Sequence, residues 1–279
     1  EKFKNLLVYD AINKILNKNK ILAPRLYTQR YDKNFIEIQD FGNETVFKTL
    51  KKKGKNKLSY FNRIIKLLIQ IQSIKHRKVK NFRNQNYIIP KYDKKILINE
   101  ANLFCDWYAK NNLSKLRKKR FCKKFKKIIK ELTLKLKLKD NIFVHRDFHV
   151  SNLMSVKNQI GLIDSQDALI GNKAYDLASL IDDVRLKTSY SFKEKIFKFY
   201  TKKQKNLDIK KFKNDFEILS VLRNLKIIGI FTRLALRDRK KNYLRFIPYT
   251  WQLINMRIDQ NRTFIDLKNL LSQNFKKIK

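Results

Sequence analysis

Residues 141–164 follow the pattern of a strand, a polar loop and a second strand. The apolar segment IFV at 142–144 leads into the sequence HRDFHVSN, called here the HRD loop (residues 145–152), which contains Asp147 and Asn152. A second apolar segment, IGLI at 160–163, ends at Asp164. Short apolar runs bounded by polar residues are typical of buried strands. The pattern therefore predicts a site built on strands, in which two acids and a carboxamide lie close together.

The charge distribution singles out the same part of the chain. The sequence has a formal net charge of +42, with 66 Lys and Arg against 24 Asp and Glu, yet residues 140–183 contain seven acids and three bases. We expect a basic chain that keeps an acidic segment to need its carboxylates there, and carboxylates with a carboxamide suit Mg²⁺. Elsewhere Lys outnumbers Arg and is spread widely along the chain, which disfavours nucleic acid as the partner.

Most of the remaining sequence has helical spacing of its apolar residues. This spacing is present at residues 3–16, 60–74 and 121–136, and helices are again expected from residue 174 to the C-terminus. The strand-like pieces RLYTQR and FIEIQ are joined by YDKN, which predicts a hairpin. No apolar run reaches the ~18–20 residues that a membrane-spanning helix needs. The fold class is therefore α+β, with a small mixed part followed by a larger, mainly helical part.

The residues of the HRD loop and of the strand that follows it suit phosphoryl transfer. The attacking hydroxyl needs a carboxylate that orients it and accepts its proton, and Asp147 is the candidate. A metal ion that neutralises nucleotide phosphates needs hard oxygen ligands, which Asn152 and Asp164 offer. The alternative is a chance occurrence, because Asp and Asn are common in loops.

The segments HRDFHVSNLM and GLIDSQDALIGNKAYDLASL resemble the aminoglycoside phosphotransferase/choline kinase superfamily, whose members are relatives of protein kinases. The chain differs from protein kinases, because Asp164 lies in IDSQD instead of D-F-G and no A-P-E follows. Residues 99–108, 163–183 and 225–244 are most similar to the anomeric N-acetylmuramate/N-acetylglucosamine kinases. The resemblance implies a protein-kinase-like fold of two lobes with a truncated N-terminal lobe and a mainly helical C-terminal lobe.

The resemblance also implies roles for single residues. Asp147 would be the catalytic base, and Asn152 and Asp164 would be the Mg²⁺ ligands. His145 would support the HRD loop structurally. Asp176 would accept hydrogen bonds from the backbone of that loop, or it is simply a carboxylate favoured in the first turn of a helix.

The lobes implied by the resemblance divide the chain at residue 44. Residues 1–44 would be the remainder of the small lobe, with a helix, two strands and a hinge, and residues 45–279 the helical catalytic lobe. The strands that bind phosphate through a Lys are expected to precede residue 1. Backbone groups of the hinge residues Gln39, Asp40 and Phe41 would meet the adenine of ATP.

Residues outside the HRD loop are candidates for binding a sugar. Glu100 could accept hydrogen bonds from the ring hydroxyls of a sugar, and Trp107 and Tyr108 could stack on the C–H groups of that sugar, although Trp107 also fits a helix core. Asp167 would face substrate or support Asp164. The remaining two candidates are Arg223 and Arg237, which could pair with a carboxylate, with a surface salt bridge as the commoner alternative.

The predicted activity is transfer of the γ-phosphoryl group of ATP, with Mg²⁺, to a small-molecule hydroxyl. The anomeric hydroxyl of an N-acetylated amino sugar is favoured, which suggests recycling of cell-wall sugars in the cytoplasm. Two Cys residues, Cys105 and Cys122, cannot form a disulfide framework, and this agrees with a reducing compartment. The alternatives are a kinase of another small alcohol or of an aminoglycoside, and a non-catalytic basic protein that binds nucleic acid or anionic surfaces.

Overall fold

The computed structural model of the protein describes residues 2–52, 54 and 56–275. The chain forms two compact units, each made of two separate stretches of sequence. Unit 1 consists of Glu1–Lys91 and Lys139–Leu207, and unit 2 consists of Tyr92–Leu138 and Asp208–Lys279. The lobe boundary predicted between residues 44 and 45 lies inside unit 1 and stays a prediction.

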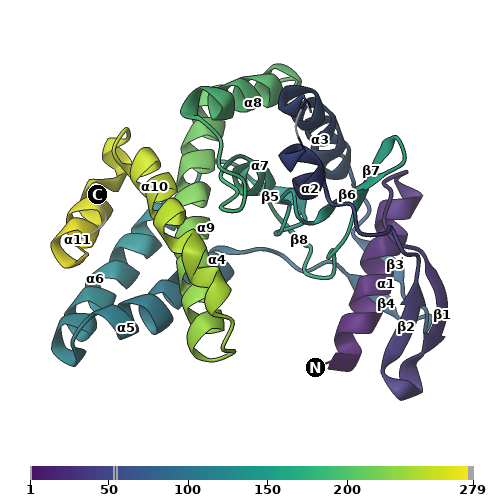
Figure 1. Ribbon diagram of the computed structural model, residues 1–279, viewed down its shortest axis with the longest axis horizontal. Coiled ribbons are helices and arrows are strands. Elements are labelled where there is room, and N and C mark those ends of the chain that lie inside the picture. The colour runs from purple at the N-terminus through teal and green to yellow at the C-terminus, as the bar shows by residue number, and fades with distance from the viewer. Residues whose placement is uncertain (1, 53, 55, 276–279) are drawn as a thin grey trace. The chain divides into compact units, whose positions relative to one another are not determined.

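Unit 1 begins with a helix and a hairpin. Helix α1 (Lys2–Lys18) buries one apolar face that includes Ile12 and Leu16. Strands β1 (Leu26–Arg30) and β2 (Phe35–Ile38) pair antiparallel (Figure 1). Residues of α1 and of both strands line one cavity. The short 3₁₀ helix η1 (Tyr31–Lys33) forms the turn between the strands. The helix and the hairpin are therefore present where the sequence predicted them.

The next part of unit 1 is helical and includes a second hairpin. Its elements are α2 (Val46–Lys51), α3 (Lys57–Gln72), β3 (Lys78–Lys80) and β4 (Asn86–Ile88). Helix α2 starts at Thr45, whose Oγ1 accepts a hydrogen bond from the backbone N–H of Lys48, an N-cap of the preferred kind. Helix α3 buries the predicted apolar face, including Phe61 and Ile64, and packs on the strand that precedes the HRD loop.

The second stretch of unit 1 contains the HRD loop. Its elements are β5 (Asp140–Val144), β6 (Leu153–Val156), β7 (Gln159–Leu162), β8 (Leu169–Asn172), α7 (Ala174–Ile181) and α8 (Tyr190–Lys202). Strand β5 pairs antiparallel with β8, and β6 pairs antiparallel with β7. The HRD loop runs from β5 to β6, so two small sheets fix its ends.

Unit 2 is helical. Its elements are α4 (Lys94–Leu103), the π-helical turn η2 (Phe104–Ala109), α5 (Lys110–Asn112), α6 (Lys115–Leu134), α9 (Ile209–Leu236), η3 (Lys241–Phe246), α10 (Ile247–Ile258), η4 (Arg262–Phe264) and α11 (Ile265–Asn274). The long helix α9 packs on α4, η2 and α10. At Gly229 the backbone of α9 approaches that of Leu103 and Phe104 so closely that a Cβ atom would overlap it.

Helix α6 shows how the high Lys content is accommodated. Phe121, Phe125, Ile129 and Leu132 are buried in the core of unit 2, while most of its cationic residues are exposed. The helix therefore has the apolar face that the spacing at residues 121–136 predicted, and its basic residues form a solvated face. Cys105 and Cys122 are both free thiols. Among the described residues there is no helix long and apolar enough to cross a membrane.

Candidate active site

The HRD loop follows β5, whose last residues, Phe143 and Val144, are buried. Burial of this strand fixes where the loop starts. Arg146 then adopts a left-handed backbone conformation, with φ of 74°, which is uncommon for a residue with a side chain. Asp147, the predicted base, comes directly after this turn and is half-buried. Non-glycine residues in this conformation persist where the surroundings enforce them, and they occur often at functional sites.

Asn152 joins the two predicted acids. Its Nδ2 donates to the backbone carbonyl of Asp147 at 3.1 Å and to the Oδ2 atom of Asp164 at 3.3 Å. Asp164 follows β7, is exposed, and also has a positive φ, of 62°. The structure thus brings Asp147, Asn152 and Asp164 into one cluster within unit 1.

Gln166 belongs to this cluster, although the sequence analysis did not single it out. Its Nε2 donates to the Oδ1 atom of Asp164 at 2.8 Å, so an amide group contacts each oxygen of this carboxylate. The sequence feature that could have identified Gln166 is its position two residues after Asp164 in IDSQD. Amide donors leave the charge of the carboxylate uncompensated, so the Asp164 carboxylate can still attract a cation.

The donor set fits Mg²⁺. Asp164 offers an exposed carboxylate, and the Asn152 side chain offers an amide oxygen, because its bonds to Asp147 and Asp164 are both made by Nδ2. Mg²⁺ typically takes one or two protein carboxylates and completes its shell with water and substrate phosphates. Within the described ranges, no group of three or more His, Cys, Asp or Glu residues could hold a metal ion.

His145 connects the HRD loop to the strand that leads to Asp164. Its side chain is buried, and its Nε2 lies 3.1 Å from the carbonyl oxygen of Ile163. A carbonyl can only accept, so Nε2 carries the proton in this contact. Burial lowers the pKa of His145, and the nearby Asp147 carboxylate opposes that shift only in part. Burial thus favours the neutral imidazole, and the structural role of His145 stays a prediction.

Asp176 holds the start of the loop. It lies in the first turn of α7, is 0% exposed, and accepts hydrogen bonds from the backbone N–H groups of His145 at 2.7 Å and Arg146 at 3.0 Å. These are the contacts expected of a residue that supports the HRD loop. Such charge-assisted hydrogen bonds are about twice as strong as bonds between neutral groups. One of the two holds the backbone N–H of Arg146, the residue with the left-handed backbone conformation.

The hinge lies in the same unit. Asp40 accepts a hydrogen bond from the backbone N–H of Gly42 at 2.7 Å, and the backbone N–H of Gln39 donates to Arg25 at 2.8 Å. The ring of Phe41 lies against Gly161 of β7, where a Cβ atom would come within 2.8 Å of the ring. Phe41 thus rests on the sheet that follows the HRD loop.

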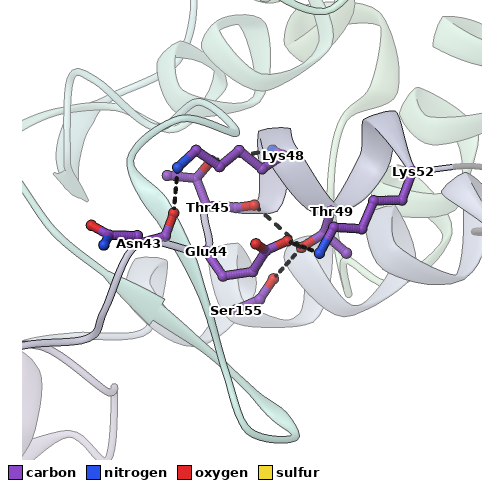
Figure 2. Close-up of polar contacts among 7 residues, drawn as sticks. All are labelled: Asn43, Glu44, Thr45, Lys48, Thr49, Lys52 and Ser155. Atoms are coloured by element: carbon purple, nitrogen blue, oxygen red, sulfur yellow. Dashed lines mark hydrogen bonds and ion pairs between the residues drawn. The ribbon is translucent and has the colours of Figure 1, made fainter.

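A polar cluster after the hinge fastens it to β6, as Figure 2 shows. The carboxylate of Glu44 pairs with Lys52 at 2.8 Å and accepts from Thr49 at 2.9 Å, and Thr49 contacts the hydroxyl of Ser155 at 3.0 Å. The backbone N–H of Ser155 donates to the carbonyl of Glu44 at 2.8 Å. The hydrogen bonds from Lys52 and Thr49 lower the pKa of Glu44. No motif in the sequence indicates the contacts of Ser155 with Glu44 and Thr49, which join residues more than 100 positions apart.

Asp167 lies beside the HRD loop. Its carboxylate is 3.5 Å from Nη1 of Arg146, and the same nitrogen donates to its backbone carbonyl at 3.2 Å. The Asp167 side chain is mostly exposed. A role toward substrate or toward Asp164 stays a prediction.

The other predicted sugar-binding residues lie in unit 2. Glu100 forms an ion pair with Lys226 at 3.0 Å and accepts a hydrogen bond from Tyr92. Tyr108 packs in an aromatic cluster with Phe104, Trp251 and Phe275, so its ring serves the core of unit 2.

Three further candidates belong to the same unit. Trp107 is half-buried in η2. Arg237, at the end of α9, pairs with the neighbouring Asp238 at 2.7 Å, which is the surface salt bridge considered as its alternative. Arg223 is buried in α9, and its Nη1 has no hydrogen-bond partner within the part of the chain that the structure describes. Binding of substrate by any of these residues stays a prediction.

Comparison with known proteins places this geometry among phosphotransferases. The sequence profile of the phosphotransferase enzyme family matches residues 7–207. The chain is 27% identical to an N-acetylmuramate/N-acetylglucosamine kinase of Neisseria meningitidis serogroup B, over 81% of this chain and 67% of the relative. It is 28% identical to an enzyme of the same name from Pseudomonas aeruginosa, over 90% and 72% of the two chains.

The fold is similar to that of solved phosphotransferases. A spectinomycin phosphotransferase in complex with AMP superposes with a TM-score of 0.61 at 15% identity, over 91% of this chain and 85% of the other. The protein-kinase-like α+β fold that the sequence predicted is therefore confirmed.

Proposed function

Since the chain belongs to the phosphotransferase enzyme family, we propose that it transfers the γ-phosphoryl group of ATP to the anomeric hydroxyl of an N-acetylated amino sugar. The observation that supports this most strongly is the side chain of Asn152, which contacts both the backbone of Asp147 and the carboxylate of Asp164. One residue thus links the proposed base to the proposed metal ligand.

Asp147 would act on the sugar hydroxyl. Its carboxylate would accept a hydrogen bond from the attacking hydroxyl, orient it toward the γ-phosphorus and take its proton as the new P–O bond forms, while the bond from the γ-phosphorus to the bridging oxygen breaks and ADP leaves. Asp176 and the buried His145 hold the backbone on which Asp147 lies. Positioning is the larger part of catalysis in this reaction class, so a firmly held loop is what the chemistry needs.

Asp164 and Asn152 would hold a Mg²⁺ ion, which neutralises charge on the nucleotide phosphates. The adenine would meet backbone groups of Gln39, Asp40 and Phe41, with the ring of Phe41 fixed against Gly161. These residues and the HRD loop all belong to unit 1, which supports a single nucleotide site there.

The choice of an amino sugar rests on the relatives. Two of them are named N-acetylmuramate/N-acetylglucosamine kinase, and they match 81% and 90% of this chain. Because ATP is the co-substrate, we place the reaction in the cytoplasm and in the recycling of cell-wall sugars. Glu100, Trp107 and Arg223 are the unit 2 residues that we propose for recognition of the sugar.

The proposal is tested by a substrate panel. The purified 279-residue chain, with Mg²⁺ and ATP, is given N-acetylglucosamine, N-acetylmuramate, choline, ethanolamine and an aminoglycoside, and ADP release is measured for each. We expect the two amino sugars to stimulate ADP release and Asp147→Asn to abolish the stimulation. Stimulation by choline or an aminoglycoside alone would assign the protein to a different substrate class within the same family.

A further inference from the structure

Asp182 and Asp183 directly follow α7. Both side chains are buried, yet the proposed reaction uses neither of them. A buried carboxylate is costly unless it is hydrogen-bonded or paired with a cation. The partners of these two residues therefore show what each one does.

The carboxylate of Asp183 binds the HRD loop. Its Oδ2 accepts a hydrogen bond from the backbone N–H of Val150 at 3.3 Å, and its Oδ1 accepts from the backbone N–H of Arg185 at 2.9 Å. Val150 is 0% exposed, and its carbonyl accepts from the backbone N–H of Phe47 at 3.0 Å. Both backbone polar groups of Val150 are thus fixed, one by Asp183 and one by α2.

Asp182 and Lys193 fix the position of Asp183. The Nζ atom of Lys193 in α8 lies 3.2 Å from the carboxylate of Asp182 and donates to the carbonyl of Ile181 at 2.6 Å. Lys193 is only 2% exposed, so this pair is shielded from water and from salt. The last turn of α7 is therefore tied to α8, and Asp183 extends from that turn toward the loop.

We propose that Asp183 is a positioning residue for phosphoryl transfer. Asp176 holds the N–H groups of His145 and Arg146, and Asp183 holds that of Val150. In the sequence, Asp147 lies between the residues held by Asp176 and the residue held by Asp183. Two buried carboxylates at the two ends of one helix thus fix the loop on both sides of the proposed base. This inference rests on the proposed function, because it concerns the placement of that base.

Asp215 provides a matched control in unit 2. It is 0% exposed and accepts hydrogen bonds from the backbone N–H groups of Lys137 and Leu138, both at 2.8 Å. The Asp215→Asn variant therefore makes the same chemical change as Asp183→Asn, at a loop that bears none of the proposed catalytic residues.

The experiment compares Asp183→Asn, Asp183→Ala and Asp215→Asn with the unchanged chain. We expect kcat to fall by about 10–100-fold in Asp183→Ala and by less in Asp183→Asn, because small misplacements of reacting groups have effects of this order. KM for ATP should stay within about twofold, because the contacts that bind ATP equally well in the ground state and the transition state are unchanged. Asp215→Asn should lower the melting temperature and leave kcat unchanged. Equal kcat values for the Asp183 and Asp215 variants would overturn the proposal.

Hydrogen exchange gives a readout that does not need a substrate. The amide of Val150 should exchange faster in both Asp183 variants and at the original rate in Asp215→Asn. Unchanged protection of Val150 in Asp183→Ala would overturn the proposal by itself, because Ala has no oxygen that could accept this hydrogen bond. If the unchanged chain phosphorylates none of the sugars, the proposed function fails, and the exchange rates still decide whether Asp183 holds the loop.

Discussion

A loop in each unit is held by a buried aspartate, and only one of the two loops has the residues for chemistry. In unit 1, Asp176 accepts two backbone hydrogen bonds from the HRD loop at 2.7 and 3.0 Å. In unit 2, Asp215 accepts two from residues 137 and 138 at 2.8 Å each. The HRD loop bears Asp147, whereas the loop in unit 2 bears Lys135 and Lys137.

The comparison separates two uses of a carboxylate. Asp176, Asp182 and Asp183 are buried and bind backbone groups or Lys193, whereas Asp164 and Asp167 are exposed. An acidic segment in a basic chain therefore does not by itself indicate a metal site. Exposure and the partners of each carboxylate decide which acids can meet a substrate and which hold the backbone.

The largest effect should come from Asp147, the half-buried acid of the HRD loop. Asp147→Asn keeps the shape of the side chain and removes the proton acceptor, so we expect kcat to fall by about 10²–10⁴-fold. Steady-state kinetics with the preferred sugar measure the change, and Asp215→Asn serves as the control. A variant that retains most of its turnover would remove Asp147 from the mechanism.

The second effect concerns the metal. Asp164→Ala removes the exposed carboxylate between Asn152 and Gln166, so ATP should bind at least about 10-fold more weakly in the presence of Mg²⁺. Titration calorimetry with and without Mg²⁺ measures this loss. Asp32→Ala removes an exposed acid elsewhere in unit 1 and should change nothing. Equal losses in the two variants would mean that the acids act only through their combined charge.

Two glycines offer a further contrast between the units. Gly229→Ala places a Cβ against the backbone of Leu103 in unit 2, so we expect a loss of about 1–3 kcal/mol in the free energy of unfolding. Gly161→Ala pushes instead on the ring of Phe41, a side chain that can move, so it should raise KM for ATP with a smaller change in stability. Thermal unfolding and ATP titration of both variants measure the two effects. A higher KM for ATP in Gly229→Ala than in Gly161→Ala would contradict the assignment of Phe41 to the nucleotide.

The smallest effect is a dependence of stability on pH. Burial lowers the pKa of His145 in the folded chain. The contribution of the neutral imidazole to the free energy of unfolding is therefore complete above about pH 6.5, the pKa of His in the unfolded chain, and is lost as the pH falls below that value. The loss is at most about 1.4 kcal/mol per pH unit for one proton. Denaturant unfolding at pH 7.5 and 5.5 should show a larger drop for the unchanged chain than for His145→Gln. An equal drop would show that His145 does not titrate differently in the folded state.

Local patterns predicted much of the fold. Helix α1, the β1–β2 hairpin and the apolar face of α6 all follow from spacing and turn residues within short windows. Asp176 could be named because its motif, YDLA, resembled a family pattern. These features share one property, which is that the deciding residues are neighbours in sequence.

Contacts between distant residues could not be predicted in this way. Thr49 and Ser155 are 106 positions apart, and Val150 and Asp183 are 33 apart. Unit 2 is assembled from residues 92–138 and 208–279, so no window of sequence contains its core. Trp107 and Tyr108 are neighbours in sequence, and the ring contacts of Tyr108 with Phe104, Trp251 and Phe275 come from residues as many as 167 positions away.

The position of the transferred phosphate tests the central claim most directly. Phosphorus and proton NMR of the product from N-acetylglucosamine, Mg²⁺ and ATP report which sugar carbon bears the phosphate. The account predicts a phosphate on the anomeric carbon with the unchanged chain and, in the same time, at least about 100-fold less of this product with Asp147→Asn. A phosphate on another carbon, or an equal yield from Asp147→Asn, would contradict it.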